Sequence, residues 1–141
     1  MKSKLLLFMA IFALAFSACS DDDEGSGDTE MTVMLSVYYE MANSDYEYPD
    51  SNSKVYVFRG TDFTNSKYEY KGEGKFYNKE NGNWSDAKQT LSMGNSVVIP
   101  IKCTYDCTIA VESAHYDGGF AIKTKSLNDK DKTIKVVFPA Q

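Results

Sequence analysis

Short runs of β-forming residues recur from residue 31 to the C-terminal end of this sequence, with turn residues between them. In residues 31–40 the apolar Val33, Leu35 and Val37 alternate with more polar positions, which is the pattern of a half-buried strand. No stretch after residue 30 keeps a sustained helical period or an internal repeat. The chain is therefore predicted to be all-β.

Further strands are expected at residues 54–59, 97–101, 108–112, 120–125 and 133–138. Residues 67–79 predict one bent strand or two short ones, with Gly72 and Gly74 marking a bulge or turn. Residues 41–53 and 80–95 are polar and predict loops. Pro100 favours an edge strand, and the short gap before 108–112 predicts a hairpin between those two runs. About seven short strands at this spacing predict a single antiparallel β-sandwich.

The first eighteen residues have the three-part design of a bacterial secretion signal. A basic start with Lys2 and Lys4 precedes twelve apolar residues, Leu5 to Phe16, and the small pair Ser17-Ala18 follows. As a helix, the apolar run would rise about 18 Å, well short of the roughly 30 Å hydrocarbon core. A cleaved signal peptide over residues 1–18 is therefore predicted, rather than a permanent membrane span.

The residues Phe16-Ser17-Ala18-Cys19 resemble the lipobox of bacterial lipoproteins, with Phe16 where leucine is commoner. The resemblance implies cleavage before Cys19 and attachment of lipid to Cys19. Two or three acyl chains give a stable anchor, whereas one binds a membrane only marginally. The alternative is an ordinary signal peptide cut near Ala18, which would leave Cys19 as an unpaired thiol.

An acidic run, Ser20 to Glu24, follows the cysteine at once and leads into Gly25-Ser26-Gly27-Asp28. Like charges repel one another, so residues 19–29 are expected to form a flexible tether. The run resembles the acidic tag of Bacteroidetes surface lipoproteins, which implies export to the outer face of the outer membrane. The alternative is a plain solvated spacer.

Loss of residues 1–18 would leave 123 residues with a net charge of −7, from 13 basic and 20 acidic side chains. Residues 30–141 are enough for one domain and too few for two. Nucleic-acid binding requires a basic patch, and this acidic chain has no basic cluster. A nucleic-acid partner is therefore not expected.

Two strand patterns carry a family resemblance. Residues 53–58, after a Pro-Asp turn, resemble the second strand of transthyretin-like and carboxypeptidase-regulatory-like sandwiches. Residues 105–111 resemble the later, tyrosine-led strand of the same domains. The resemblance implies an immunoglobulin- or transthyretin-like sandwich over residues 30–141 and transfers no catalytic residue.

Cys103 and Cys107 are the cysteines that remain after Cys19. An even number in an oxidising compartment favours a disulfide. In one extended strand their Cα atoms would lie about 13 Å apart, so the bond requires a turn between them. Two reduced, partly buried thiols are the alternative. Zinc generally takes four ligands, and a single histidine offers too few, so no metal or other cofactor is expected.

No catalytic constellation stands out. His115, the single histidine, lies before a Gly-Gly turn without a nucleophile motif nearby, and no phosphate-binding loop or metalloprotease motif is present. The chain has ten tyrosines, and four aromatic residues fall in predicted loops. They could stack on sugars, anchor a protein partner, or simply cap the sandwich. These four residues are Tyr46, Tyr48, Trp84 and Tyr116.

The sequence thus predicts a lipid-anchored lipoprotein of the outer membrane, exposed at the cell surface and not an enzyme. Its domain would be a binding or assembly module for a glycan or for a protein of the outer membrane. The alternative is a structural lipoprotein that faces the periplasm and has no small-molecule ligand.

Overall fold

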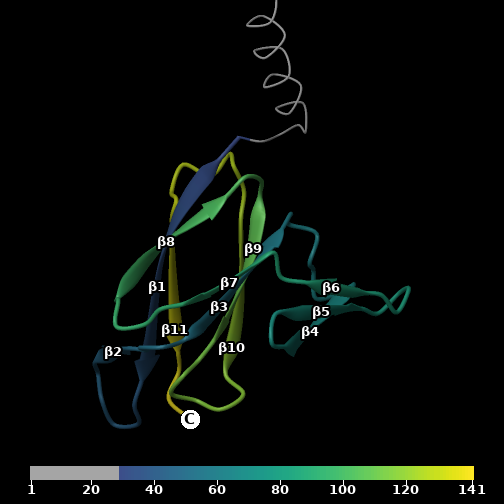
Figure 1. Cartoon of the computed structure of the whole chain (residues 1–141). Coiled ribbons are helices and arrows are strands. Elements are labelled where there is room, and N and C mark those ends of the chain that lie inside the picture. Colours follow the sequence, from purple (N-terminus) through teal and green to yellow (C-terminus); the bar gives the residue numbers. More distant parts are fainter. Residues whose placement is uncertain (1–28) are drawn as a thin grey trace, which may run out of the picture.

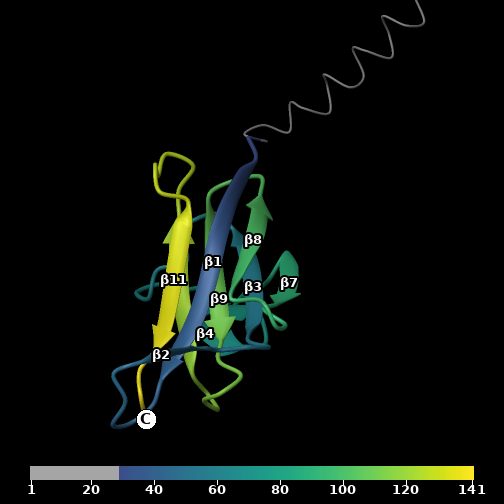
Figure 2. The ribbon, with the colours of Figure 1, turned by 90° about the vertical axis from the view of Figure 1, so that its left-hand side faces the viewer.

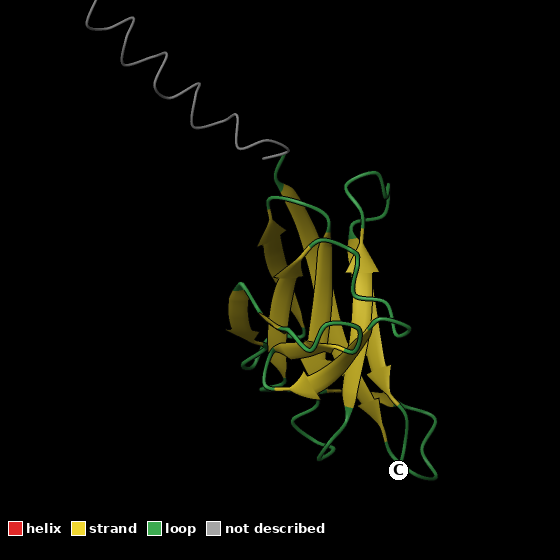
Figure 3. Ribbon diagram, turned by 90° about the vertical axis from the view of Figure 1, so that its right-hand side faces the viewer, coloured by secondary structure: helices red, strands yellow, loops and turns green. Residues whose placement is uncertain are grey.

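The computed structural model describes residues 29–141, which form eleven strands and no helix (Figure 3). The strands are β1 (Met31–Glu40), β2 (Glu47–Pro49), β3 (Lys54–Arg59), β4 (Tyr68–Gly72), β5 (Lys75–Asn78), β6 (Trp84–Asp86), β7 (Gln89–Ser92), β8 (Val98–Cys103), β9 (Cys107–Glu112), β10 (Phe120–Lys125) and β11 (Thr133–Phe138). Among these described residues, no helix is long and apolar enough to cross a membrane.

The strands form three sheets, which lie in succession across Figure 1. Sheet A contains β11, β1, β2 and β8, with β1 between β11 on one side and β8 and β2 on the other. Sheet B has the order β10-β9-β3-β7, and the small sheet C has the order β4-β5-β6. Sheet B therefore lies between the other two sheets.

The main core lies between sheets A and B. Alternate residues of β1 point into it, and Val33 and Leu35 are fully buried. They meet Val55 and Val57 from β3 and Ile109 from β9 in one apolar cluster. The two sheets thus pack face to face as a β-sandwich-like fold, in which period-2 alternation provides the buried face of each strand.

A second core lies on the opposite face of sheet B. Tyr56 and Phe58 of β3 are buried there against Tyr70 and Phe76 of sheet C, together with Ala110 of β9. Strand β3 is consequently buried on both faces at its four central positions. Sheet C is an added layer that covers part of the outer face of sheet B.

Most strand predictions are confirmed. The predicted runs at 31–40, 54–59, 120–125 and 133–138 coincide with β1, β3, β10 and β11. Residues 67–79 form two short strands, and the register shifts between Tyr70 and Gly72, as the glycines suggested. Pro100 lies in β8, which pairs only with β1 within the described part of the chain, so its edge position is confirmed as well.

Two features of the predicted sandwich are wrong. The described chain has eleven strands, because the polar segments expected to be loops contribute the short strands β2, β6 and β7. The pairing is also not purely antiparallel, since β1 runs parallel to β11. These strands come from opposite ends of the domain, and a local sequence pattern carries no information about such a distant pairing.

The predicted hairpin between residues 97–101 and 108–112 is wrong too. Strand β8 pairs with β1 in sheet A, whereas β9 pairs with β3 and β10 in sheet B. The three residues between Cys103 and Cys107 therefore carry the chain from one sheet to the other. A short connection looks the same in sequence whether it turns within a sheet or crosses between two.

The sandwich has two distinct ends (Figure 2). At the entry end the described chain enters β1, and Met31 pairs with Cys103. The loop of residues 126–132 lies at the same end, because Thr133, which follows it, pairs with Met34. At the far end β1 finishes at Glu40, opposite Glu47, and β9 finishes at Glu112.

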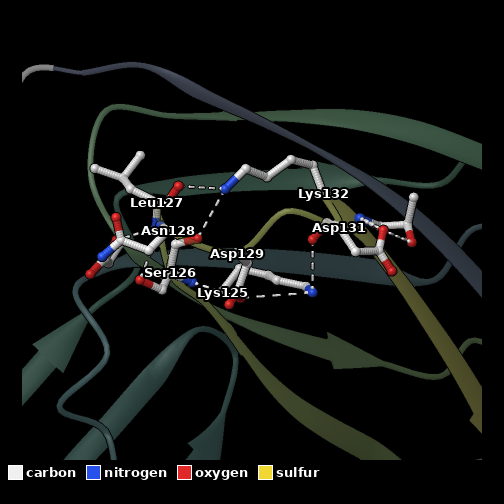
Figure 4. Close-up of polar contacts among 9 residues, drawn as sticks. Lys125, Ser126, Leu127, Asn128, Asp129, Asp131 and Lys132 are labelled. Carbon is white, nitrogen blue, oxygen red and sulfur yellow. Dashed lines mark hydrogen bonds and ion pairs between the residues drawn. The ribbon is translucent and has the colours of Figure 1, made fainter.

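Two lysine side chains close the 126–132 loop: Lys132 within it and Lys125 at the end of β10 (Figure 4). The Lys132 ammonium donates to the carbonyl oxygens of Ser126 at 3.1 Å and Leu127 at 2.7 Å. The Lys125 ammonium donates to the Asp131 carbonyl at 3.1 Å and lies 3.8 Å from the Asp129 carboxylate. Two cations thus satisfy backbone carbonyl groups of this turn.

The predictions for residues 1–18 and for Cys19 lie outside the described residues. Of the predicted tether, 19–29, only the last residue is described.

Candidate functional site

The four predicted aromatic residues do not form one site. Tyr48 and Tyr116 both contact Tyr39 at the far end, with ring centroids 5.6 and 6.0 Å from it. Trp84 lies in β6 of sheet C against Tyr77, at 5.1 Å, and is 56% exposed. Tyr46 precedes β2 and is 74% exposed. The structure therefore brings Tyr48 and Tyr116 together and leaves Trp84 on another sheet.

Tyr48 and Tyr116 are built into the end of the sandwich. The Tyr116 hydroxyl donates to the carbonyl oxygen of Glu40 at the end of β1. The ring of His115 stacks on Tyr39 with centroids 3.8 Å apart and planes 11° from parallel. Rings that pack so closely on one another offer little free face, which supports the capping alternative for Tyr48 and Tyr116.

A buried carboxylate fixes the loop that carries Tyr116. Asp50 is 2% exposed and accepts hydrogen bonds from the Ser113 hydroxyl at 2.5 Å and from the backbone N–H groups of Ala114 and His115, both at 3.2 Å. Ser53, also buried, accepts the Ala114 N–H at 3.4 Å. This anchor holds the start of the 113–119 loop against the β2–β3 connection.

A cavity of about 540 Å³ opens beside that loop. It lies where the end of β9 and the start of β10 in sheet B meet β4 and the β4–β5 turn of sheet C. Its volume is within the range of roughly 300–1,000 Å³ that small-molecule sites occupy. The side chains that matter for its chemistry are Lys54, Tyr70, Lys71, Glu73, Glu112, Asp117 and Phe120.

Neutral donors hold the Glu112 carboxylate at the inner wall of the cavity. The Tyr70 hydroxyl donates to Glu112 Oε1 at 3.2 Å, and the Glu73 backbone N–H donates to the same oxygen at 2.7 Å. The Tyr70 oxygen in turn accepts the Gly74 N–H at 3.0 Å. A carboxylate held by fixed donors is oriented before any ligand arrives.

The same network keeps Tyr70 protonated. Burial raises the pKa of Tyr70 most, the hydrogen bond from Gly74 lowers it, and the Glu112 carboxylate raises it again. Burial also raises the pKa of Tyr56, and Glu112 adds to that shift. Both phenols therefore remain neutral at any pH near neutrality and serve as donors or packing groups rather than as bases.

Phe120 provides the apolar surface of the cavity. It is 52% exposed at the start of β10, where it pairs in register with Glu112 on β9. Its ring lies 5.3 Å from the Tyr70 ring and is tilted 58° from it. One edge of Phe120 is thus supported by Tyr70, and the remaining surface is free to contact a ligand.

The charged groups around the cavity are of both signs. Glu73, Glu112 and Asp117 contribute carboxylates, and Lys54 and Lys71 contribute ammonium groups. Lys71 is paired with Glu69 at 2.7 Å, although both side chains are exposed. The cavity therefore presents hydrogen-bond donors and acceptors together with one aromatic face, and its carboxylates outnumber its ammonium groups by one.

Sequence reasoning missed the cavity residues Tyr70, Glu112 and Phe120. The alternation of apolar and polar residues places each of these side chains on one face of a strand. The cavity, however, is formed by the packing of sheet C on sheet B, and the local sequence carries no signal of that packing. The one available hint was a phenylalanine directly after the Gly118-Gly119 turn, where a strand begins and side chains are often exposed.

Cys103 and Cys107 are free thiols in the structure, so it does not contain the predicted disulfide. Both are buried, Cys103 in sheet A and Cys107 in sheet B. The Cys103 thiol donates to the Tyr105 carbonyl at 2.7 Å. Burial, and then the neighbouring Cys103, raise the pKa of Cys107 to about 12.

We expect the reduced, folded chain to react very slowly at Cys107. At pH 8 a thiol with a pKa of about 8.5 is roughly one quarter ionised, whereas a thiol with the raised pKa of about 12 is ionised in about one molecule in ten thousand. Because the thiolate is the nucleophile, alkylation of Cys107 by iodoacetamide should be at least about a thousandfold slower than in the urea-unfolded chain.

Fragment mass spectra that separate label on Cys107 from label on Cys103 measure this rate. The rate should keep rising up to pH 11, because the thiol remains mostly protonated below its raised pKa. A plateau near pH 9 would contradict the assigned environment of Cys107.

No group of three or more histidine, cysteine or acidic side chains within residues 29–141 is arranged to hold a metal ion.

The comparisons with protein-family models, with curated proteins and with solved structures gave no significant match to this chain.

Proposed function

We propose that this chain is a lipoprotein of the outer membrane, anchored by lipid on Cys19 and exposed at the cell surface. Its β domain would serve as a non-catalytic binding or assembly module for a glycan or a protein. The observation that carries the binding role is the cavity of about 540 Å³ with the half-exposed Phe120 beside the fixed Glu112 carboxylate.

The position of the cavity supports this role. Lipid on Cys19 would hold the domain from the entry end, where the described chain runs into β1. The cavity lies at the far end, where β9 finishes at Glu112. The ten residues of β1 span about 30 Å. An anchored domain would therefore present the cavity away from the bilayer.

The finer fold assignment is part of the proposal. Two sheets packed face to face around one core support an immunoglobulin- or transthyretin-like sandwich. A protein with the same topology would have both the parallel β1–β11 pair and the added sheet C.

We expect Cys19→Ala to abolish lipid labelling and membrane retention. Each buried methylene contributes about 0.8 kcal/mol, so loss of two or three acyl chains removes nearly all affinity for the bilayer. Radiolabelled palmitate incorporation and fractionation of the cells measure both effects. Cys103→Ala is the matched control, because it removes a thiol that lies inside the folded domain. Equal labelling of the Cys19→Ala variant and the wild type would refute the anchor.

Protease treatment of intact cells tests surface exposure. Digestion of the domain without lysis supports the proposed orientation. Complete protection until the outer membrane is opened would instead favour a structural lipoprotein that faces the periplasm.

We also propose that Cys103 and Cys107 become bonded in an oxidising compartment. Cys103 is close enough to Cys107 to hydrogen-bond to it and perturb its thiol, which supports the pairing. Closing so short a loop would stabilise the fold by about 2 kcal/mol in the chain-entropy account. Alkylation of both cysteines in the unfolded chain, without prior reductant, would rule out the bridge.

A further inference from the structure

We propose that the cavity beside Glu112 binds an uncharged saccharide, with Phe120 as the stacking surface and Glu112 as a hydroxyl acceptor. This inference rests on the proposed binding function and names the class of ligand and the residues that recognise it.

The aromatic surface is the first part of the argument. Phe120 is 52% exposed, although it lines a cavity in which charged and polar side chains predominate. Its ring is supported from one side by Tyr70, at 5.3 Å. A supported ring whose other surface is open suits the apolar C–H face of a pyranose, and such stacking leaves the sugar hydroxyls free to reach polar groups around it.

The fixed carboxylate is the second part. Oε1 of Glu112 accepts from Tyr70 and from the Glu73 N–H. No ion pair to Glu112 is found within the described chain, although its register partner Lys54 lines the same cavity. The Tyr56 hydroxyl also interacts with the Glu112 carboxylate. A carboxylate has about four acceptor positions, so at least one remains for a ligand hydroxyl. Hydrogen bonds to a charged acceptor are stronger than neutral ones.

Phe120 and Glu112 lie next to each other by register. They are directly paired on the adjacent strands β10 and β9. One ligand ring can therefore stack on Phe120 while its hydroxyls reach the Glu112 carboxylate. The Asp50 anchor fixes the loop that forms the remaining wall, which carries Asp117.

The charges around the cavity argue against an anionic ligand. A phosphate or a uronate would meet three carboxylates, those of Glu73, Glu112 and Asp117, against two ammonium groups, one of which is also paired with Glu69. A hydroxyl-rich, uncharged molecule uses hydrogen-bond donors and acceptors alike and does not face this repulsion.

The test uses the full lipidated chain, purified from membranes in detergent. The probes are immobilised neutral oligosaccharides of glucose, galactose, mannose and N-acetylglucosamine, alongside uronate-containing and sulfated glycans. We expect binding to at least one neutral probe. Phe120→Ala and Glu112→Gln should each weaken it about tenfold or more, which corresponds to about 1.4 kcal/mol.

Two variants provide controls. Trp84→Ala removes a similarly exposed aromatic side chain from sheet C, outside the cavity, and should leave binding unchanged. Phe120→Tyr keeps the ring and should retain binding. Thermal unfolding of each variant shows separately whether a loss of binding in Phe120→Ala reflects a loss of folding.

Neutral-glycan binding that persists in both cavity variants, or that Trp84→Ala abolishes, would overturn the assignment of the site. Binding only to acidic glycans, or only to a protein captured by crosslinking on the cell surface, would overturn the saccharide inference and leave the proposed binding function intact. Absence of any glycan or protein ligand would overturn both.

Discussion

Replacing Phe58 by alanine is expected to lower the free energy of unfolding by about 3–5 kcal/mol and to release sheet C before the sandwich unfolds. Phe58 is 1% exposed and points away from the main core. Its ring lies 5.2 Å from Phe63 and 4.8 Å from Phe76 of sheet C. Removing it leaves a void in the contact that holds sheet C on sheet B.

Trp84 makes this effect measurable, because it is the only tryptophan in the chain and lies in sheet C. In Phe58→Ala the fluorescence transition of Trp84 in urea should precede the far-ultraviolet circular dichroism transition of the whole domain. Val57→Ala is the matched control, since Val57 is its neighbour on β3 but faces sheet A. That change should cost about 1.5–3 kcal/mol and shift both transitions together.

Coincident transitions in Phe58→Ala, with a loss below about 1 kcal/mol, would contradict the second core. Separate transitions in Val57→Ala would contradict the assignment of the two faces of β3.

Gly74→Ala is expected to destabilise the fold by about 2–5 kcal/mol, through two costs that add. Gly74 has φ +72°, a left-handed conformation that costs an alanine about 1–2 kcal/mol. A Cβ atom there would also lie 2.5 Å from Cδ1 of Tyr56, within a buried ring. Relief of this overlap requires a shift of the β4–β5 turn or of Tyr56, at about 1–3 kcal/mol.

Gly82→Ala separates the two costs. Gly82 has nearly the same φ as Gly74, +74°. A Cβ atom added at Gly82 would lie 3.7 Å from the Tyr77 hydroxyl, an ordinary van der Waals distance. This variant should lose only the conformational part, about 1–2 kcal/mol. Urea unfolding of both variants measures the difference. Equal losses would mean that Tyr56 does not press on Gly74.

The strands of this domain could be read from sequence where alternation and turn chemistry coincide. Val33, Leu35 and Val37 repeat every second residue and are all buried, so the position and inward face of β1 follow from the sequence. The pairing of β1 with β8 and β11 does not follow from the sequence. The residues that pair with it on those strands lie more than sixty residues away, and period-2 patterning is identical for parallel and antiparallel pairing.

The candidate site was harder to predict for the same reason. The sequence predicts Tyr48 and Tyr116 as loop aromatics, but Tyr48 lies in β2 and both rings pack on Tyr39. Phe120 and Glu112 become a site only because sheet C stands beside them. The placement of that sheet depends on the contact between the buried rings of Phe58 on sheet B and Phe76 on sheet C. No local sequence pattern shows that Phe58 faces away from the main core.

The placement of β1 has a mechanical consequence. A ligand held at the far end and a lipid attached before β1 would pull the domain along the axis of that strand. Along its length β1 is hydrogen-bonded to β11 on one side and to β8 and then β2 on the other. Such a load acts across the bonds of both edges together, as a shear, instead of opening them one after another. The strand that would carry the load from the proposed anchor is thus an inner strand of sheet A, with bonded neighbours on both of its edges.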